Sequence, residues 1–91
     1  MRIEFDPVKS KHNEEERGLP FSAAEDFEWS GAKILPDIRH DYPEPRYAAY
    51  GMIRGRLHFL CFTPLADGIR IISFRKANKR EVKRYEQQTA D

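Results

Sequence analysis

Residues 46–76 decide the fold; they read RYAAYGMIRGRLHFLCFTPLADGIRIISFRK. The stretch contains three apolar-rich runs of strand length, at residues 46–53, 56–62 and 69–74. Arg54-Gly55 separates the first two runs, and residues 64–68, which begin with proline and end with glycine, separate the last two. The sequence therefore predicts a three-strand antiparallel meander.

A strand and a helix are expected before the meander. Residues 2–5 alternate polar and apolar side chains, which predicts a short strand. Asp6 is a favourable N-cap and Pro7 suits the first position of a helix, so we expect a polar helix from there to about residue 17. Gly18 is a typical residue to end it.

Two further helices and one more strand complete the expected elements. Ser22-Ala23-Ala24-Glu25 is a capping-box pattern, which predicts a second, short helix. Residues 32–35 are read as a strand, and Asn78 with Glu81 predicts a final helix to about Gln88. Three residues of the second helix region are expected to face the core: Phe21, Ala24 and Phe27.

The expected architecture is α+β, with residues 1–91 as a single domain. A small antiparallel sheet, made of the three-strand meander and an N-terminal strand, is covered by two N-terminal helices and a C-terminal helix. Hydrophobic residues at 40% and eleven aromatic side chains exclude a disordered chain. The start has no apolar region typical of a signal peptide, and no apolar run is long enough for a membrane span. The cytoplasm is therefore the default expectation.

Charge divides unevenly along the chain. Residues 1–45 carry a net charge of −5 and residues 46–91 a net charge of +6. Such a contrast is a hint of contact with nucleic acid, and the simpler interpretation is two solvated faces that attract each other. Between residues 70 and 85 one acidic side chain, Glu81, opposes seven basic ones: Arg70, Arg75, Lys76, Lys79, Arg80, Lys83 and Arg84. Arginine suits phosphate because its planar fork donates two hydrogen bonds at once. The alternative is a solvated basic face with no ligand.

Strand alternation separates the two arginines of the third meander run. Arg70 and Arg75 are an odd number of residues apart, so they leave opposite faces of a regular strand unless a bulge intervenes. On that pattern one of the two has a structural role, paired with a carboxylate.

A proline-rich loop at residues 36–45 leads into the meander and brings Asp41, Tyr42, Glu44 and Arg46 close together. The simpler interpretation is a surface ion pair between Glu44 and Arg46, worth little. His40 in this loop is a candidate general base. No histidine pair has metal-ligand spacing, and the single cysteine, Cys61, reads as a small buried apolar residue, so we expect neither a metal site nor a cofactor.

Three segments together resemble the BrnT family of ribonuclease toxins, within the wider RelE-like fold. The first runs from Phe5-Asp6-Pro7-Val8-Lys9 through Asn13 and Gly18 to Pro20-Phe21-Ser22-Ala23-Ala24. The second is Glu44-Pro45-Arg46 with Tyr47 and Gly51, and the third is residues 69–77 with Glu81 and Tyr85. Two positions depart from the family pattern. Glu16-Arg17 stand where the family usually has Lys-His, and Phe74 stands where a small residue is usual.

The resemblance implies a metal-independent endoribonuclease that inhibits translation by cutting mRNA. A cognate antitoxin of the BrnA type would silence it, and contact with DNA would come only through that antitoxin. Carried over to this chain, the implied catalytic residues are Arg46, Arg70, Arg75 and Glu44. The expected RNA-binding residues are Lys76, Lys79, Arg80, Lys83 and Tyr85.

The chemistry suits such a set because attack by the RNA 2′-hydroxyl builds negative charge on the phosphate, and fixed guanidinium groups stabilise that charge. Arginine does not act as a base, so the base is Glu44 or His40 and the acid is Tyr85 or a water. Two other functions stay open. One is a weak or inactive relative that binds an antitoxin or another target such as topoisomerase; the other is a plain nucleic-acid-binding domain.

Overall fold

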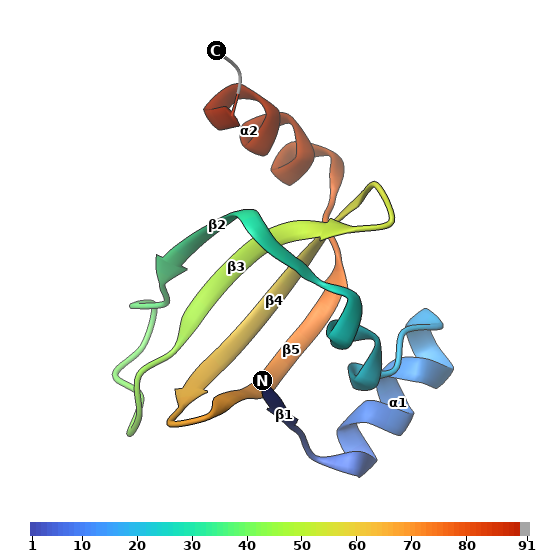
Figure 1. The fold of residues 1–91 in the computed structure, drawn as a ribbon, viewed down its shortest axis with the longest axis vertical. Helices are drawn as coiled ribbons and strands as arrows, with labels where there is room; N and C mark the ends of the chain where they lie inside the picture. Colours follow the sequence, from blue (N-terminus) through green and yellow to red (C-terminus); the bar gives the residue numbers. More distant parts are fainter. Residues whose placement is uncertain (90–91) are drawn as a thin grey trace.

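The computed structural model describes residues 1–89, which form one five-stranded mixed sheet and its helices (Figure 1). The strands are β1 (Arg2–Glu4), β2 (Glu28–Pro36), β3 (Tyr47–Ile53), β4 (Arg56–Leu65) and β5 (Gly68–Lys76). The helices are α1 (Pro7–Arg17), the 3-10 helix η1 (Phe21–Asp26) and α2 (Lys79–Thr89). No helix within residues 1–89 is long and apolar enough to span a membrane. The α+β class is confirmed.

The meander forms as predicted. Strands β3, β4 and β5 pair antiparallel in sequence order. Arg54 and Gly55 link the first two strands with φ angles of 48° and 77°. Positive φ at both central residues makes this a type I′ turn, whose twist matches the flanking strands. The second turn is tighter than predicted, because β4 continues to Leu65 and only Ala66-Asp67 remain between the strands.

The expectation of a purely antiparallel sheet is wrong. Strand β1 pairs parallel to β5, with Ile3 opposite Ile69, so the sheet order is β1-β5-β4-β3-β2. The local alternation of residues 2–5 shows a strand but carries no information about its partner, which lies more than 60 residues away. Strand β2 is also longer than predicted; its pairing with β3 is irregular between Glu28 and Lys33, around Gly31 at φ 82°.

Helix α1 begins and ends where its sequence signals predict. The Asp6 side chain accepts a hydrogen bond from the Val8 amide at 2.9 Å, and Gly18 ends the helix at φ 66°. Asn13 fastens the helix to the sheet, because its side-chain amide donates to the carbonyls of Leu19 at 2.7 Å and Phe74 at 2.9 Å.

The second predicted helix is a 3-10 helix, and its capping box does not form. It begins after Pro20, no side chain caps it, and Ser10 of α1 accepts from the Phe21 amide at 2.9 Å instead. The expected inward residues are nevertheless buried. Phe21, Ala24 and Phe27 lie against the inner side chains of β3, β4 and β5. These include Ala49, Ile53, Leu60, Phe62, Ile69, Ile71 and Phe74.

The core therefore lies on one face of the sheet. Phe74 is 1% exposed and points into this core, so it lies away from the opposite face. His58 is on the core side as well, with its Nδ1 2.8 Å from the Arg56 carbonyl oxygen; burial lowers the pKa of its imidazole. His58 is thus a buried strand histidine whose Nδ1 has a backbone partner.

Candidate functional site

The sheet face opposite the core is covered by charged side chains. Phe59, Cys61 and Thr63 of β4 point to this face because they alternate with the core residues Leu60 and Phe62. All three are buried, so other side chains must lie over them. We call this surface the arginine face, defined by Phe59, Cys61 and Thr63 together with Arg70 and Arg75 of β5.

A bulge in β5 brings Arg70 and Arg75 to the same face. Cys61 pairs with Ser73 but Phe62 pairs with Ile71, so Ile72 has no partner in the β4–β5 ladder. This extra residue shifts the alternation by one position. Arg70 lies opposite Thr63 and Arg75 opposite Phe59. The exception stated for the predicted strand therefore applies: a bulge intervenes, and the two arginines share a face instead of leaving opposite faces. Their backbones are separated by roughly 15 Å of strand.

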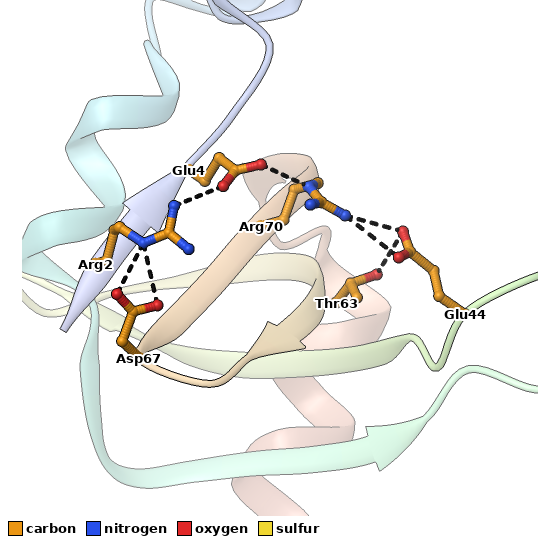
Figure 2. Close-up of polar contacts among 6 residues, drawn as sticks. All are labelled: Arg2, Glu4, Glu44, Thr63, Asp67 and Arg70. Atoms are coloured by element: carbon orange, nitrogen blue, oxygen red, sulfur yellow. Dashed lines mark hydrogen bonds and ion pairs between the residues drawn. The ribbon is translucent and has the colours of Figure 1, made fainter.

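Arg70 lies between two carboxylates (Figure 2). Its Nε donates to Glu4 Oε1 at 2.9 Å, and its Nη1 lies 3.3 Å from Glu44 Oε1 and from Glu44 Oε2. The Thr63 hydroxyl also reaches Glu44, at 3.5 Å. Glu44 thus pairs with Arg70 rather than with Arg46, which corrects the predicted surface ion pair. The hydrogen bonds from Arg70 and Arg2 lower the pKa of Glu4.

Arg75 is held more firmly, at the other end of the face. Its two terminal nitrogens donate to the two carboxylate oxygens of Glu81 at 2.7 and 3.0 Å. Its guanidinium lies 4.4 Å from the centre of the Phe59 ring, within cation–π range. The Tyr50 hydroxyl donates to Glu81 at 3.2 Å. Burial and the neighbouring Glu81 charge raise the pKa of Tyr50.

Glu81 also caps helix α2. Its carboxylate accepts from the Asn78 amide at 2.9 Å, and the Asn78 side chain accepts from the Glu81 amide at 2.9 Å, which is the predicted capping box. These contacts, led by the hydrogen bonds from Arg75, lower the pKa of Glu81 from 4.5 to about 2. One carboxylate therefore fixes both the start of α2 and the direction of Arg75.

The lowered Glu81 pKa predicts a specific loss of stability in acid. A carboxylate with a lowered native pKa stabilises the fold above pH 4.5, and this contribution disappears as the pH falls toward 2. We expect Glu81→Gln to remove about 1–2 kcal/mol of this pH dependence, since one pKa unit equals about 1.4 kcal/mol and solvent screens part of it. Urea unfolding at pH 6 and pH 2.5 measures it. Glu86→Gln, at an exposed side chain, is the control. If the free energy of unfolding changed equally between pH 6 and pH 2.5 in both variants, Glu81 would not be the source of the pH dependence.

The loop between β2 and β3 supplies the middle of the arginine face. Asp37 accepts two hydrogen bonds from the Arg39 guanidinium, each 2.8 Å, and lies 3.7 Å from the Cys61 sulfur. The Arg39 contacts lower the pKa of Asp37 to about 2. Burial and Asp37 raise the pKa of the Cys61 thiol, whereas the charges of Arg46 and Arg39 oppose that rise. The Asp37 carboxylate therefore lies between the Arg39 guanidinium and the Cys61 thiol.

Arg46 differs from the other two candidate arginines. Its guanidinium lies 4.0 Å from the centre of the Tyr42 ring, and its Nε is buried with no hydrogen-bond partner. Within residues 1–89 it makes no ion pair, whereas Arg70 and Arg75 both do. A buried donor without a partner costs about 1–3 kcal/mol, so it needs an explanation.

The remaining predicted residues lie apart from these clusters, on α2, at the end of β5 and in the β2–β3 loop. Four of the predicted RNA-binding side chains are exposed: Lys76, Lys79, Arg80 and Lys83. Tyr85 turns toward β2, where its hydroxyl donates to the Gly31 carbonyl at 2.9 Å. His40 is exposed in the β2–β3 loop, with its ring 5.7 Å from that of Tyr42. Residues 1–89 contain no group of three His, Cys, Asp or Glu side chains able to hold a metal ion.

Sequence reasoning missed three participants on this face. Tyr50 and Phe59 contact the Arg75–Glu81 pair, and Asp37 neutralises Arg39 beside Cys61. Tyr50 and Phe59 are directly opposite each other in the β3–β4 ladder. Their alternation with core residues is the signal that could have placed them on the arginine face. No local pattern shows that Asp37 folds back onto β4.

Comparison with protein families identifies a match over most of the chain. The family model described as the ribonuclease toxin BrnT of type II toxin–antitoxin systems matches residues 5–81. This range includes the three arginines, Glu44 and Glu81. No curated protein and no solved structure matches the chain.

Proposed function

The chain belongs to the BrnT family of ribonuclease toxins of type II toxin–antitoxin systems, and on that premise we propose that the arginine face is its RNA-cleaving site. The proposed reaction is metal-independent cleavage of mRNA, which stops translation. The observation that carries this proposal is the β5 bulge, which puts Arg70 and Arg75 on one face together with Glu44.

The guanidinium groups supply the main chemical effect. When the 2′-hydroxyl attacks the adjacent phosphorus, negative charge grows on the non-bridging phosphate oxygens. Donors already fixed in place stabilise this charge without the cost of reorienting. Glu81 fixes Arg75 by two hydrogen bonds, and Glu4 and Glu44 together fix Arg70. In this proposal the carboxylates position the arginines, and the arginines stabilise the phosphate.

Glu44 is the proposed general base. Its contacts with Arg70 and Thr63 are long, at 3.3 to 3.5 Å, and its side chain is 40% exposed. Its oxygens are therefore accessible to a 2′-hydroxyl. Glu44 accepts the 2′-hydroxyl proton, the 2′-oxygen bonds to phosphorus, and the bond from phosphorus to the 5′-oxygen breaks. A water protonates the leaving 5′-oxygen, because the Tyr85 hydroxyl is engaged by Gly31. His40 is the alternative base.

The exposed basic side chains before and on α2 would bind the RNA backbone beyond the cut site. These side chains attract phosphates regardless of RNA sequence; they are Lys76, Lys79, Arg80 and Lys83. Tyr85 lies on the side of α2 that faces β2. A type II toxin has a cognate antitoxin. We propose that acidic segments of an antitoxin of the BrnA type cover this basic surface, and that any contact with DNA is made by the antitoxin.

Cleavage by the purified protein tests this function directly. We expect RNA to be cut in the presence of EDTA, leaving 2′,3′-cyclic phosphate and 5′-hydroxyl ends. A substrate with a 2′-deoxyribose at the cut position should not be cut there. A pulse of expression in cells should stop growth and shorten mRNA. Folded protein that neither cuts RNA nor stops growth would contradict the proposal.

One observation favours a second candidate function. Arg70 and Arg75 are already paired with carboxylates, as expected for arginines with a structural role. On this alternative the chain is a weak or inactive relative that binds protein, either its antitoxin or another target such as topoisomerase. Growth arrest without RNA cleavage would favour that alternative.

A further inference from the structure

The β2–β3 loop borders an open hollow on the molecular surface. The hollow has a volume of about 720 Å³ and is lined by residues 36–47. Three features meet in it: the aromatic rings of Tyr42 and His40, and the guanidinium of Arg46. The hollow borders Glu44, so it lies next to the proposed general base.

We propose that this hollow binds one nucleotide of the RNA, adjacent to the scissile phosphate. The proposal rests on the proposed function and names a subsite of the same face. Arg46 would take the phosphate, and the base would lie against the rings of His40 and Tyr42.

Charge in the loop supports a phosphate beside Arg46. Arg39 pairs with Asp37 and Arg70 pairs with Glu44, whereas Asp41, exposed in the same loop, forms no ion pair among residues 1–89. Arg46 forms no ion pair within residues 1–89, and its half-buried side chain lines the hollow. A phosphate oxygen is an acceptor of the right charge, and arginine binds phosphate through two donors at once.

The rings supply a surface for a nucleobase. His40 and Tyr42 stand at 85° to each other with their centres 5.7 Å apart, which makes a right-angled corner. Arg46 occupies one face of Tyr42, whereas His40 is exposed. Bases extruded from single-stranded RNA commonly stack on aromatic rings and guanidinium planes. A corner of this kind holds one base by its face and its edge.

Binding of a short RNA with 2′-O-methyl groups tests the subsite, because such RNA cannot be cleaved. Fluorescence anisotropy gives its affinity at several salt concentrations. His40→Ala should weaken binding by about tenfold, as expected for one lost stacking contact, and leave the salt dependence unchanged. Arg46→Gln should lower the slope of log affinity against log salt by about 0.7, as for one lost phosphate contact on a single strand.

His12→Ala is the matched control, because His12 is an exposed histidine on α1, paired with Glu16. It should leave the RNA affinity unchanged. Unchanged affinity in His40→Ala together with an unchanged salt slope in Arg46→Gln would overturn the subsite. The subsite would also be overturned if these two variants lost binding to the antitoxin but kept their binding to RNA, since the hollow would then be a contact site for protein. Binding of the methylated RNA by a chain that cuts no RNA would leave the subsite intact and refute the proposed function.

Discussion

Replacing Arg75 with alanine is expected to lower the rate of RNA cleavage by about 10²- to 10³-fold and to abolish growth arrest. This is the loss typical of removing one fixed donor from a site that stabilises developing negative charge. The side chain is half-buried, donates twice to Glu81 and lies over Phe59, so no neighbouring cation can take its place without moving. The loss should appear mainly in kcat, because the guanidinium acts on the transition state.

Two variants make this result specific. Arg75→Lys keeps the charge but loses the planar fork, so its cleavage rate should lie between those of the wild type and the alanine variant. Arg54→Asn removes an exposed arginine from the β3–β4 turn, where asparagine tolerates the positive φ, and should cut RNA at the wild-type rate. If a folded Arg75→Ala variant cut RNA at the wild-type rate, Arg75 would not be part of the catalytic site.

The parts of the fold that depend on neighbouring residues could be predicted from the sequence. Asp6 and Gly18 bound helix α1, Asn78 and Glu81 begin α2, and Arg54-Gly55 makes the β3–β4 turn. Each of these signals acts through hydrogen bonds or φ angles within a few residues. The parallel pairing of β1 with β5 could not be predicted in this way, because it depends on contacts between segments that are far apart in the chain.

The candidate site shows the same division more sharply. The sequence indicates that Arg70 and Arg75 matter, but a regular strand places them on opposite faces. The additional residue Ile72 reverses that result, and a bulge depends on how two strands pair, not on either strand alone. The pairing of Glu44 with Arg70 likewise joins a loop to a strand 26 residues away. Composition and motifs identify the charged residues of the site. The pairing of segments far apart in the chain determines which of these residues lie next to one another.

Phe74 gives the second large effect, on stability rather than on activity. The family pattern usually has a small residue here, and a phenylalanine on the arginine face would obstruct it. The structure instead buries Phe74 in the core, beneath η1 and beside Leu60, on the face opposite Arg75. Phe74→Ala should therefore lower the free energy of unfolding by about 3–5 kcal/mol, through lost burial and the cavity left behind.

Urea unfolding at neutral pH measures this change. Because small domains have total stabilities of about 5–15 kcal/mol, the alanine variant should be close to its unfolding limit at 37 °C. Phe74→Leu keeps most of the volume and should lose less stability. Ile38→Ala, at a side chain that is 85% exposed, should stay within about 0.5 kcal/mol of wild type. If Phe74→Ala unfolded like wild type and cut RNA faster, the side chain would lie over the arginine face, because only there can its removal open the site without leaving a cavity.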